Sequence, residues 1–190
     1  MENTQIANQL GGRAIGAIFF AVFGAIWLAL AFHALELLSV VFISGVVLGT
    51  MVLLLTGMYL VHLANRWPRV PDDPAISRAF GWINAIQWVA VAAVAFSFAK
   101  LHIDAYVMSA ITAIVGLHLL PFARLFRNRL HYGTGALLVA WALASALLVP
   151  IDHMQGIAAL GTGAILWLSA AVTLAIALQS ARESADPLAS

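Results

Sequence analysis

The chain has 190 residues, of which 63% are hydrophobic and only 9% charged, with a formal net charge of +1 at pH 7. A soluble domain is usually about 45–50% apolar and about 25% charged, so the composition excludes a water-soluble globular enzyme, a disordered chain and a coiled coil. The near balance of charge provides no basic surface for nucleic acid. The absence of cysteine excludes disulfides, iron–sulfur clusters, thiolate zinc sites and cysteine nucleophiles. The sequence therefore predicts an all-α, polytopic membrane protein.

Six apolar stretches are long enough to cross a bilayer, which takes roughly 20 residues in a helix. In chain order they are Ala14–His33, Leu37–His62, Phe80–Ala99, Ile103–Phe122, Thr134–Val149 and Ile157–Leu178. Short loops make neighbouring helices pack as antiparallel hairpins, so residues 1–190 are predicted to form one domain, a bundle of three hairpins. The longest connection carries Pro68, Pro71 and Pro74, which exclude a regular helix through it. Residues 180–190 are expected to be a flexible tail.

The basic residues predict the orientation of the bundle. All eight arginines fall on one side of the predicted spans, and Lys100 alone falls on the other; the arginines are Arg13, Arg66, Arg69, Arg78, Arg124, Arg127, Arg129 and Arg182. Basic residues concentrate on the cytoplasmic side of membrane proteins. Both termini are therefore predicted in the cytoplasm, in a multi-pass cell-membrane protein, as in a bacterial inner membrane.

Small residues at a spacing of four let helices approach closely. Such pairs occur at Gly12 and Gly16 and at Gly45 and Gly49. They fit packing within the bundle, and they also fit a homo-oligomer surrounded by membrane lipids. The three predicted hairpins also share a plan, with a histidine and an acid at each outer tip and an arginine at each inner end. That pattern fits an internal repeat, but topology rules alone would also produce it.

A first polar layer lies at the outer ends of the predicted helices. Its members are His33, Glu36, His102, Asp104, Asp152 and His153. Imidazole nitrogens and carboxylate oxygens are ligands for zinc or a similar divalent metal, so these residues are candidate metal ligands. The alternative is ordinary loop polarity, because loops between spans meet water.

A second polar layer lies in the cytoplasmic half. Its members are His118, Asn84, Gln87, Tyr59, His62 and Arg124. Ionisable residues inside a membrane are costly and are often functional, and no Asp, Glu, Lys or Arg lies in the central third of any predicted span. We expect these six side chains to line a polar cavity that binds a small polar or anionic solute. The alternative is hydrogen bonding between helices.

The tract Gly116-Leu117-His118-Leu119-Leu120-Pro121-Phe122-Ala123-Arg124 and its continuation through Tyr132 and Gly135 resembles a segment of small, uncharacterised bacterial membrane proteins with several spans. The resemblance covers residues 116–135 and implies no established activity.

Three functions are compatible with the sequence. The first is a small transporter or channel that uses the cytoplasmic polar layer. The second is an intramembrane metal-dependent enzyme that acts on a lipid or isoprenoid through the outer layer. The third is a non-catalytic partner, sensor or assembly subunit, which needs no polar site. The transporter is the function we expect from the residues.

Overall fold

A computed structural model describes residues 2–67 and 73–185 of the chain. Over these residues the fold is all-α and contains no strand, as expected. The elements are α1 (Glu2–Ala34), α2 (Val40–Ala64), α3 (Pro74–Leu101), the short 3-10 helix η1 (Asp104–Tyr106), α4 (Val107–Leu125), α5 (Arg129–Leu148) and α6 (Ile151–Ala185). All six α-helices are long and apolar enough to cross a membrane, which indicates a multi-pass membrane protein.

The outer helices of the chain extend beyond the apolar stretches. α1 begins at Glu2 rather than at Ala14, and α6 continues to Ala185 rather than ending at Leu178. Apolar composition marks only the part of a helix at hydrocarbon depth, whereas the backbone hydrogen bonds continue through polar turns on either side. Residues 180–185, expected in a flexible tail, are therefore helical, and residues 186–190 lie outside the described residues.

The connection between α2 and α3 lies partly outside the described residues, which leave out Pro68, Arg69, Pro71 and Asp72. The third proline of this connection, Pro74, is the first residue of α3, where a missing backbone N–H costs nothing. The Asp73 carboxylate caps the helix by accepting a hydrogen bond from the Ala75 backbone N–H at 2.8 Å. Pro74 thus starts α3 instead of interrupting it.

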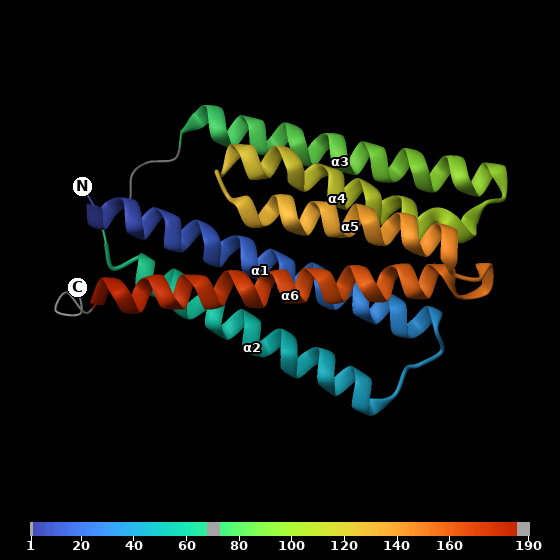
Figure 1. Cartoon of the computed structure of the whole chain (residues 1–190), viewed down its shortest axis with the longest axis horizontal. Coiled ribbons are helices and arrows are strands. Elements are labelled where there is room, and N and C mark those ends of the chain that lie inside the picture. Colours follow the sequence, from blue (N-terminus) through green and yellow to red (C-terminus); the bar gives the residue numbers. More distant parts are fainter. Residues whose placement is uncertain (1, 68–72, 186–190) are drawn as a thin grey trace.

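Consecutive helices run in opposite directions, so that both ends of the chain lie at the same end of the bundle (Figure 1). We call this the arginine end, because it also holds the α2–α3 and α4–α5 connections and all described arginines; these are Arg13, Arg66, Arg78, Arg124, Arg127, Arg129 and Arg182. The other end, which holds Lys100 and the α1–α2, α3–α4 and α5–α6 connections, we call the lysine end.

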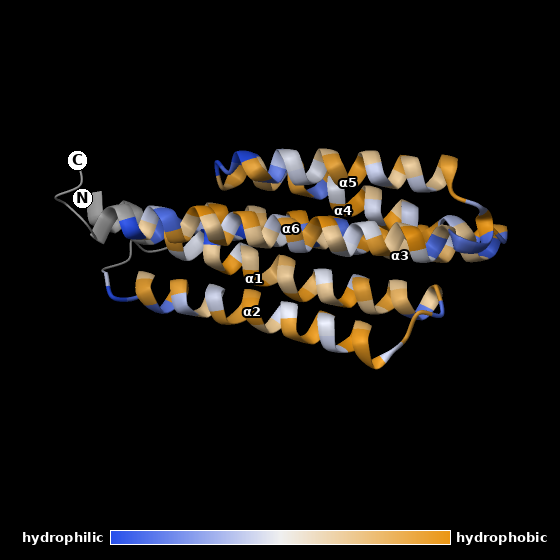
Figure 2. Ribbon diagram, turned by 60° about the horizontal axis from the view of Figure 1, so that its bottom comes forward, coloured by the Kyte–Doolittle hydropathy of each residue, from blue (hydrophilic) through white to orange (hydrophobic). Residues whose placement is uncertain are grey.

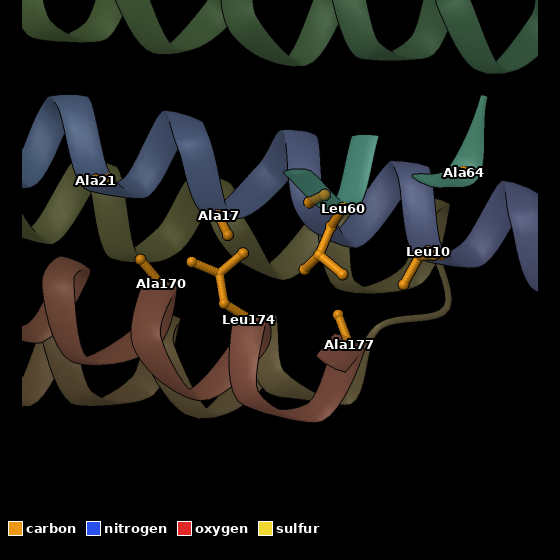
Figure 3. Packing of buried hydrophobic residues seen from close by; sticks show 9 residues of the cluster. Leu10, Ala17, Ala21, Leu60, Ala64, Ala170, Leu174 and Ala177 are labelled. Carbon is orange, nitrogen blue, oxygen red and sulfur yellow. The ribbon is translucent and has the colours of Figure 1, made fainter. Parts of the chain in front are cut away.

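α6 is the central helix and packs against α1, α2, α4 and α5. Its contact with α1 is the most extensive in the bundle and is made mainly by small side chains. Ala17 and Ala21 of α1 and Ala170 of α6 are fully buried, together with Leu60 of α2 (Figure 3). Side chains this short let the helix backbones come close, which is how helices associate without a hydrophobic driving force in a membrane.

The close approach of α4 and α5 depends on one glycine from each helix. A Cβ atom on Gly135 would lie 2.6 Å from the Gly116 carbonyl oxygen, and a Cβ atom on Gly116 would lie 2.7 Å from the Gly135 carbonyl oxygen. Such distances are shorter than real Cβ contacts. Any larger residue at either position must therefore push the two helices apart.

Pairs of hydroxyl groups join α4, α5 and α6 to one another. The oxygens are 2.9 Å apart between Ser109 and Ser145, 2.7 Å between Thr112 and Thr162, and 2.9 Å between Thr134 and Ser169. These pairs connect α4 to α5, α4 to α6, and α5 to α6. Each pair satisfies polar groups where no water is present to do so.

α2 and α3 lie at the periphery of the bundle. α2 packs on α1 and α6, whereas α3 packs on α4 and η1, and no residue of α3 is buried. Figure 2 shows that apolar residues predominate along the lengths of the spans and that hydrophilic residues gather mainly near the helix ends. The first helices of the three hairpins therefore differ in surroundings, since α1 buries a row of residues and α3 buries none.

Candidate functional site

His118 lies on α4, on the half of the helix towards the arginine end. Its Nδ1 atom is 2.9 Å from the Val115 carbonyl oxygen. A carbonyl only accepts hydrogen bonds, so Nδ1 donates, and in the neutral ring Nε2 is left as an acceptor. The edge of the ring meets Phe122, with 4.9 Å between the ring centroids. His118 is thus held in one orientation by its own helix.

His131 lies in the first turn of α5 and was not among the expected site residues. Its Nδ1 atom is buried and has no hydrogen-bond partner. In the described part of the chain, every other buried side-chain nitrogen or oxygen has one. Its ring packs against Phe20 of α1, with 5.5 Å between the centroids. Phe20 packs into the same apolar cluster as Phe122, the ring that His118 contacts. We call His118, His131, Phe20 and Phe122 the two-histidine cluster.

The sequence gives little signal for His131. It stands two residues after Arg129, in an arginine-rich stretch whose obvious explanation is membrane topology. His131 lies within α5 because the helix begins just before it. The Asn128 side chain caps the helix by accepting a hydrogen bond from the Leu130 backbone N–H at 3.1 Å. An Asn before the first helical residue is a recognisable N-cap. That cap is the signal that places His131 inside a helix rather than in a loop.

α3 meets the two-histidine cluster through stacked aromatic rings. The Phe80 ring lies parallel to Phe122, with 5.2 Å between centroids and 9° between planes. Phe80 also meets Phe126 edge-on at 6.2 Å. Aromatic pairs contribute about 0.5–1.5 kcal/mol beyond their buried area. These rings hold the otherwise unburied α3 beside His118.

Asn84 and Gln87 lie on α3, one and two turns beyond Phe80, and both are half-buried. The Asn84 amide donates to the Phe80 carbonyl oxygen at 2.8 Å, within its own helix. Both residues lie on the helix that packs against α4, as expected. Neither amide is hydrogen-bonded to His118, so the Asn84 donor serves its own backbone.

Tyr59 and His62 do not join the other members of the expected cavity. Both side chains are exposed, and both belong to α2, which packs on α1 and α6. α3 and α4 lie on the other side of the bundle (Figure 1). The position of a residue along its span can be predicted from the sequence. The neighbours of the helix that carries it cannot. A single cavity lined by all six expected side chains is therefore not what the structure contains.

Arg124 is exposed in the last turn of α4. Arg127, with a positive φ of 49°, and Arg129 follow in the tight turn to α5 and are exposed as well. Within the described residues, no carboxylate forms an ion pair with these guanidinium groups. Three uncompensated positive charges therefore surround the turn that leads into His131.

The six candidate metal ligands occupy three separate tips at the lysine end. His33 is in the last turn of α1, Glu36 in the α1–α2 connection, and His102 at the end of α3, while Asp104 begins η1 and Asp152 and His153 begin α6. Among the described residues, no group of three or more His, Asp and Glu side chains is arranged to hold a metal ion. The six residues therefore form no metal site, although the α3–α4 and α5–α6 tips touch where the Gln155 amide donates to the Asp104 carbonyl oxygen at 3.0 Å.

No known protein-family model, curated protein or solved structure matches this chain. Function is therefore inferred from the chemistry of the two-histidine cluster and of the arginines beside it.

Proposed function

We propose that the protein is a small multi-pass membrane transporter for a small polar or anionic solute, and that the two-histidine cluster is its binding site. The proposal includes cytoplasmic termini, because basic residues concentrate on that side of a membrane. The solute then enters the cluster from the arginine end.

The observation that carries the proposal is the unpartnered Nδ1 atom of His131. Leaving a buried polar group unpaired costs about 1–3 kcal/mol, and polar groups inside membrane proteins are usually functional. Every other buried hydroxyl, amide or ring nitrogen in the described chain has a partner. A solute that hydrogen-bonds to His131 would remove this cost, which favours a binding role over a purely structural one.

The surrounding charges support a polar solute of neutral or negative charge. A neutral imidazole accepts a hydrogen bond from a hydroxyl or amide donor, and a protonated one donates to an anion. Arg124, Arg127 and Arg129 raise the local concentration of anions at the arginine end. They disfavour a cation at the same place.

Osmotic swelling of proteoliposomes tests this function. Vesicles containing the protein are diluted into iso-osmotic potassium chloride, nitrate, bicarbonate, phosphate or pyruvate, with valinomycin to carry potassium, or into urea or glycerol. We expect one or a few of these solutes to cause swelling faster than in protein-free vesicles. We also expect His131→Phe to abolish that swelling and His153→Phe, at the lysine end, to preserve it. Absence of protein-dependent swelling with every solute would count against transport.

A second function, that of a non-catalytic assembly subunit, is favoured by one feature of α3. None of its residues is buried, and Gly81 has open space where a side chain would lie. Gly81 and Ala85 are small, exposed and four residues apart, a spacing that suits close helix contact. The mass of the protein in mild detergent tests this: an assembly subunit is expected to form a defined complex through α3, and a strict monomer would argue against it.

A further inference from the structure

Gln87 places an unpaired amide at the middle of a candidate membrane span. It lies at the midpoint of the 28-residue helix α3, about 20 Å from either end at about 1.5 Å per residue. Its side chain is half-buried and forms no hydrogen bond within the described residues. An amide without a partner is costly in hydrocarbon. Gln87 is therefore expected to have a polar partner that the chain itself does not provide.

The Gln87 side chain lies on the face of α3 that packs against α4. One row of half-buried residues recurs every three or four positions along α3 and so occupies one side of the helix; it consists of Ile83, Gln87, Ala90, Val94 and Phe98. Ile83 packs against the apolar cluster that contains Leu119 and Phe122 of α4. Phe98 lines the same groove as Ser109 and Ala110 of α4. Gln87, between Ile83 and Phe98 in this row, therefore faces α4 as well.

Gln87 lies level with His118 of α4. The Phe80 ring meets Phe122 and Phe126, and α3 and α4 run in opposite directions. Gln87 is seven residues beyond Phe80, so it lies opposite the part of α4 seven residues earlier, residues 115–119. By the same register Asn84 lies opposite residues 118–122. The two amides of α3 and the imidazole of His118 therefore share one level of the α3–α4 contact.

The unpaired polar atoms at this level are mainly acceptors. His118 donates through Nδ1 to the Val115 carbonyl oxygen at 2.9 Å, so in the neutral ring Nε2 accepts. Asn84 donates an amide hydrogen to the Phe80 carbonyl oxygen at 2.8 Å, which leaves its own carbonyl oxygen as an acceptor. In the described chain, no nitrogen or oxygen of His118, Asn84 or Gln87 is both unpaired and fully enclosed. Their unpaired atoms therefore keep accessible surface, which a small solute can reach.

Charge at this level favours a neutral solute over an anion. α3, α4 and α5 contain no acidic residue, so these helices offer no carboxylate to balance a positive charge on His118, and an uncompensated charge inside a membrane is costly. A neutral imidazole offers an anion only the Nε2 lone pair, which repels it. Arg124 is exposed in the last turn of α4, six residues beyond His118, and so stands outside this contact.

We infer that Gln87 and His118 determine the specificity of the transporter, and that its solute is a small neutral molecule with several N–H donors and one carbonyl, the chemistry of urea and the primary amides. The N–H groups of such a solute donate to His118 Nε2 and to the Asn84 carbonyl oxygen. Its carbonyl oxygen accepts from the Gln87 amide. This inference rests on the proposed function, since it names the solute class of the same site.

Swelling rates of proteoliposomes in iso-osmotic urea test the inference, with the rate of protein-free vesicles subtracted. We expect protein-dependent swelling in urea and none in the potassium salts of chloride, nitrate, bicarbonate, phosphate and pyruvate. Gln87→Leu removes the amide at nearly constant volume and is expected to lower the urea rate at least about tenfold, a factor that corresponds to about 1.4 kcal/mol. Ser97→Ala, which removes an exposed hydroxyl of the same helix, is the matched control and is expected to leave the rate unchanged.

Unfolding by SDS in mixed micelles separates this role from a structural one. Because the Gln87 amide has no partner in the described chain, Gln87→Leu is expected to be at least as stable as the native protein. A less stable or unfolded Gln87→Leu protein would overturn the inference, and so would a urea rate that this variant lowers no more than Ser97→Ala does. Swelling in a potassium salt or in glycerol but not in urea would also overturn it, while leaving the transport function in place. Absence of swelling in every solute would contradict transport itself.

Discussion

The buried hydroxyl oxygens of Thr112 and Thr162 lie 2.7 Å apart and connect α4 to the central helix α6. Each oxygen is also close to a carbonyl oxygen one turn back, Met108 at 2.8 Å and Ala158 at 2.7 Å. The two hydroxyl groups have one hydrogen each, but there are three short contacts: one between the threonines and one from each threonine to its own helix. One threonine therefore donates to the other instead of to its own helix. Water cannot replace this bond in the interior of a membrane protein.

Replacing Thr162 by valine is therefore expected to lower the free energy of unfolding by about 0.6 kcal/mol and by no more than about 1.7, the range for hydrogen bonds between membrane helices. Unfolding in mixed micelles with increasing SDS measures the change. Thr56→Val is the control, because the Thr56 hydroxyl bonds only to the Val52 carbonyl oxygen of its own helix, on the exposed α2. Equal losses for the two variants would show that the contact between helices contributes nothing.

Gly135→Ala is expected to destabilise the protein by about 1–3 kcal/mol, the usual cost of overpacking. The added Cβ atom would lie 2.6 Å from the Gly116 carbonyl oxygen, so α4 and α5 must separate. Gly133→Ala, two residues earlier in the same helix, meets open space and is expected to be neutral or to stabilise by up to about 1 kcal/mol through helix propensity. The same unfolding measurement compares them, and a Gly135→Ala protein as stable as Gly133→Ala contradicts the close packing.

Trp167 joins α6 to α1 and α2. Its indole N–H donates to the Ala21 carbonyl oxygen at 3.1 Å, and its ring occupies the space beside Gly24 and Gly49. Trp167→Phe is expected to cost about 0.5–1.5 kcal/mol for the lost hydrogen bond, in addition to the lost ring contacts. Trp88→Phe, at an exposed position on α3, is expected to change stability by less than about 0.5 kcal/mol. Equal stability of the two variants would refute this role for Trp167.

The two histidines are expected to respond in opposite directions to removal of their nitrogens. His131→Phe should stabilise the protein without solute by about 1 kcal/mol, because it removes a buried atom whose lack of a partner costs about 1–3 kcal/mol. His118→Phe should destabilise it by about 0.5–1.5 kcal/mol, because the bond to the Val115 carbonyl oxygen is lost. Unfolding curves in the same micelles compare the free energies of unfolding of both variants with that of the native protein. A loss of stability in His131→Phe would mean that this nitrogen has a partner in the folded protein.

The number of spans could be predicted from the sequence, because a membrane requires long apolar helices and confines charges to their ends. The positions of His118 and Tyr59 along their helices, towards the arginine end, could be predicted in the same way. Which helices pack together could not, since the spans are apolar on nearly every face and give no direction for the core. For this reason the residue pattern predicts Tyr59 and His62 beside His118 of α4, whereas α2 packs on α1 and α6. His131 could not be predicted as a site residue, because membrane topology already explains the arginines beside it in the sequence.

The most direct test of the proposed site follows the Nδ1 atom of His131 itself. Solid-state NMR of protein labelled with ¹⁵N-histidine in lipid bilayers resolves this signal, which is assigned by its loss in His131→Phe. On addition of the solute that swells the proteoliposomes, we expect the His131 Nδ1 resonance to shift, because a hydrogen bond forms where none existed, while the His153 signals stay in place. An unchanged His131 Nδ1 resonance at a solute concentration that saturates swelling would contradict the proposed site.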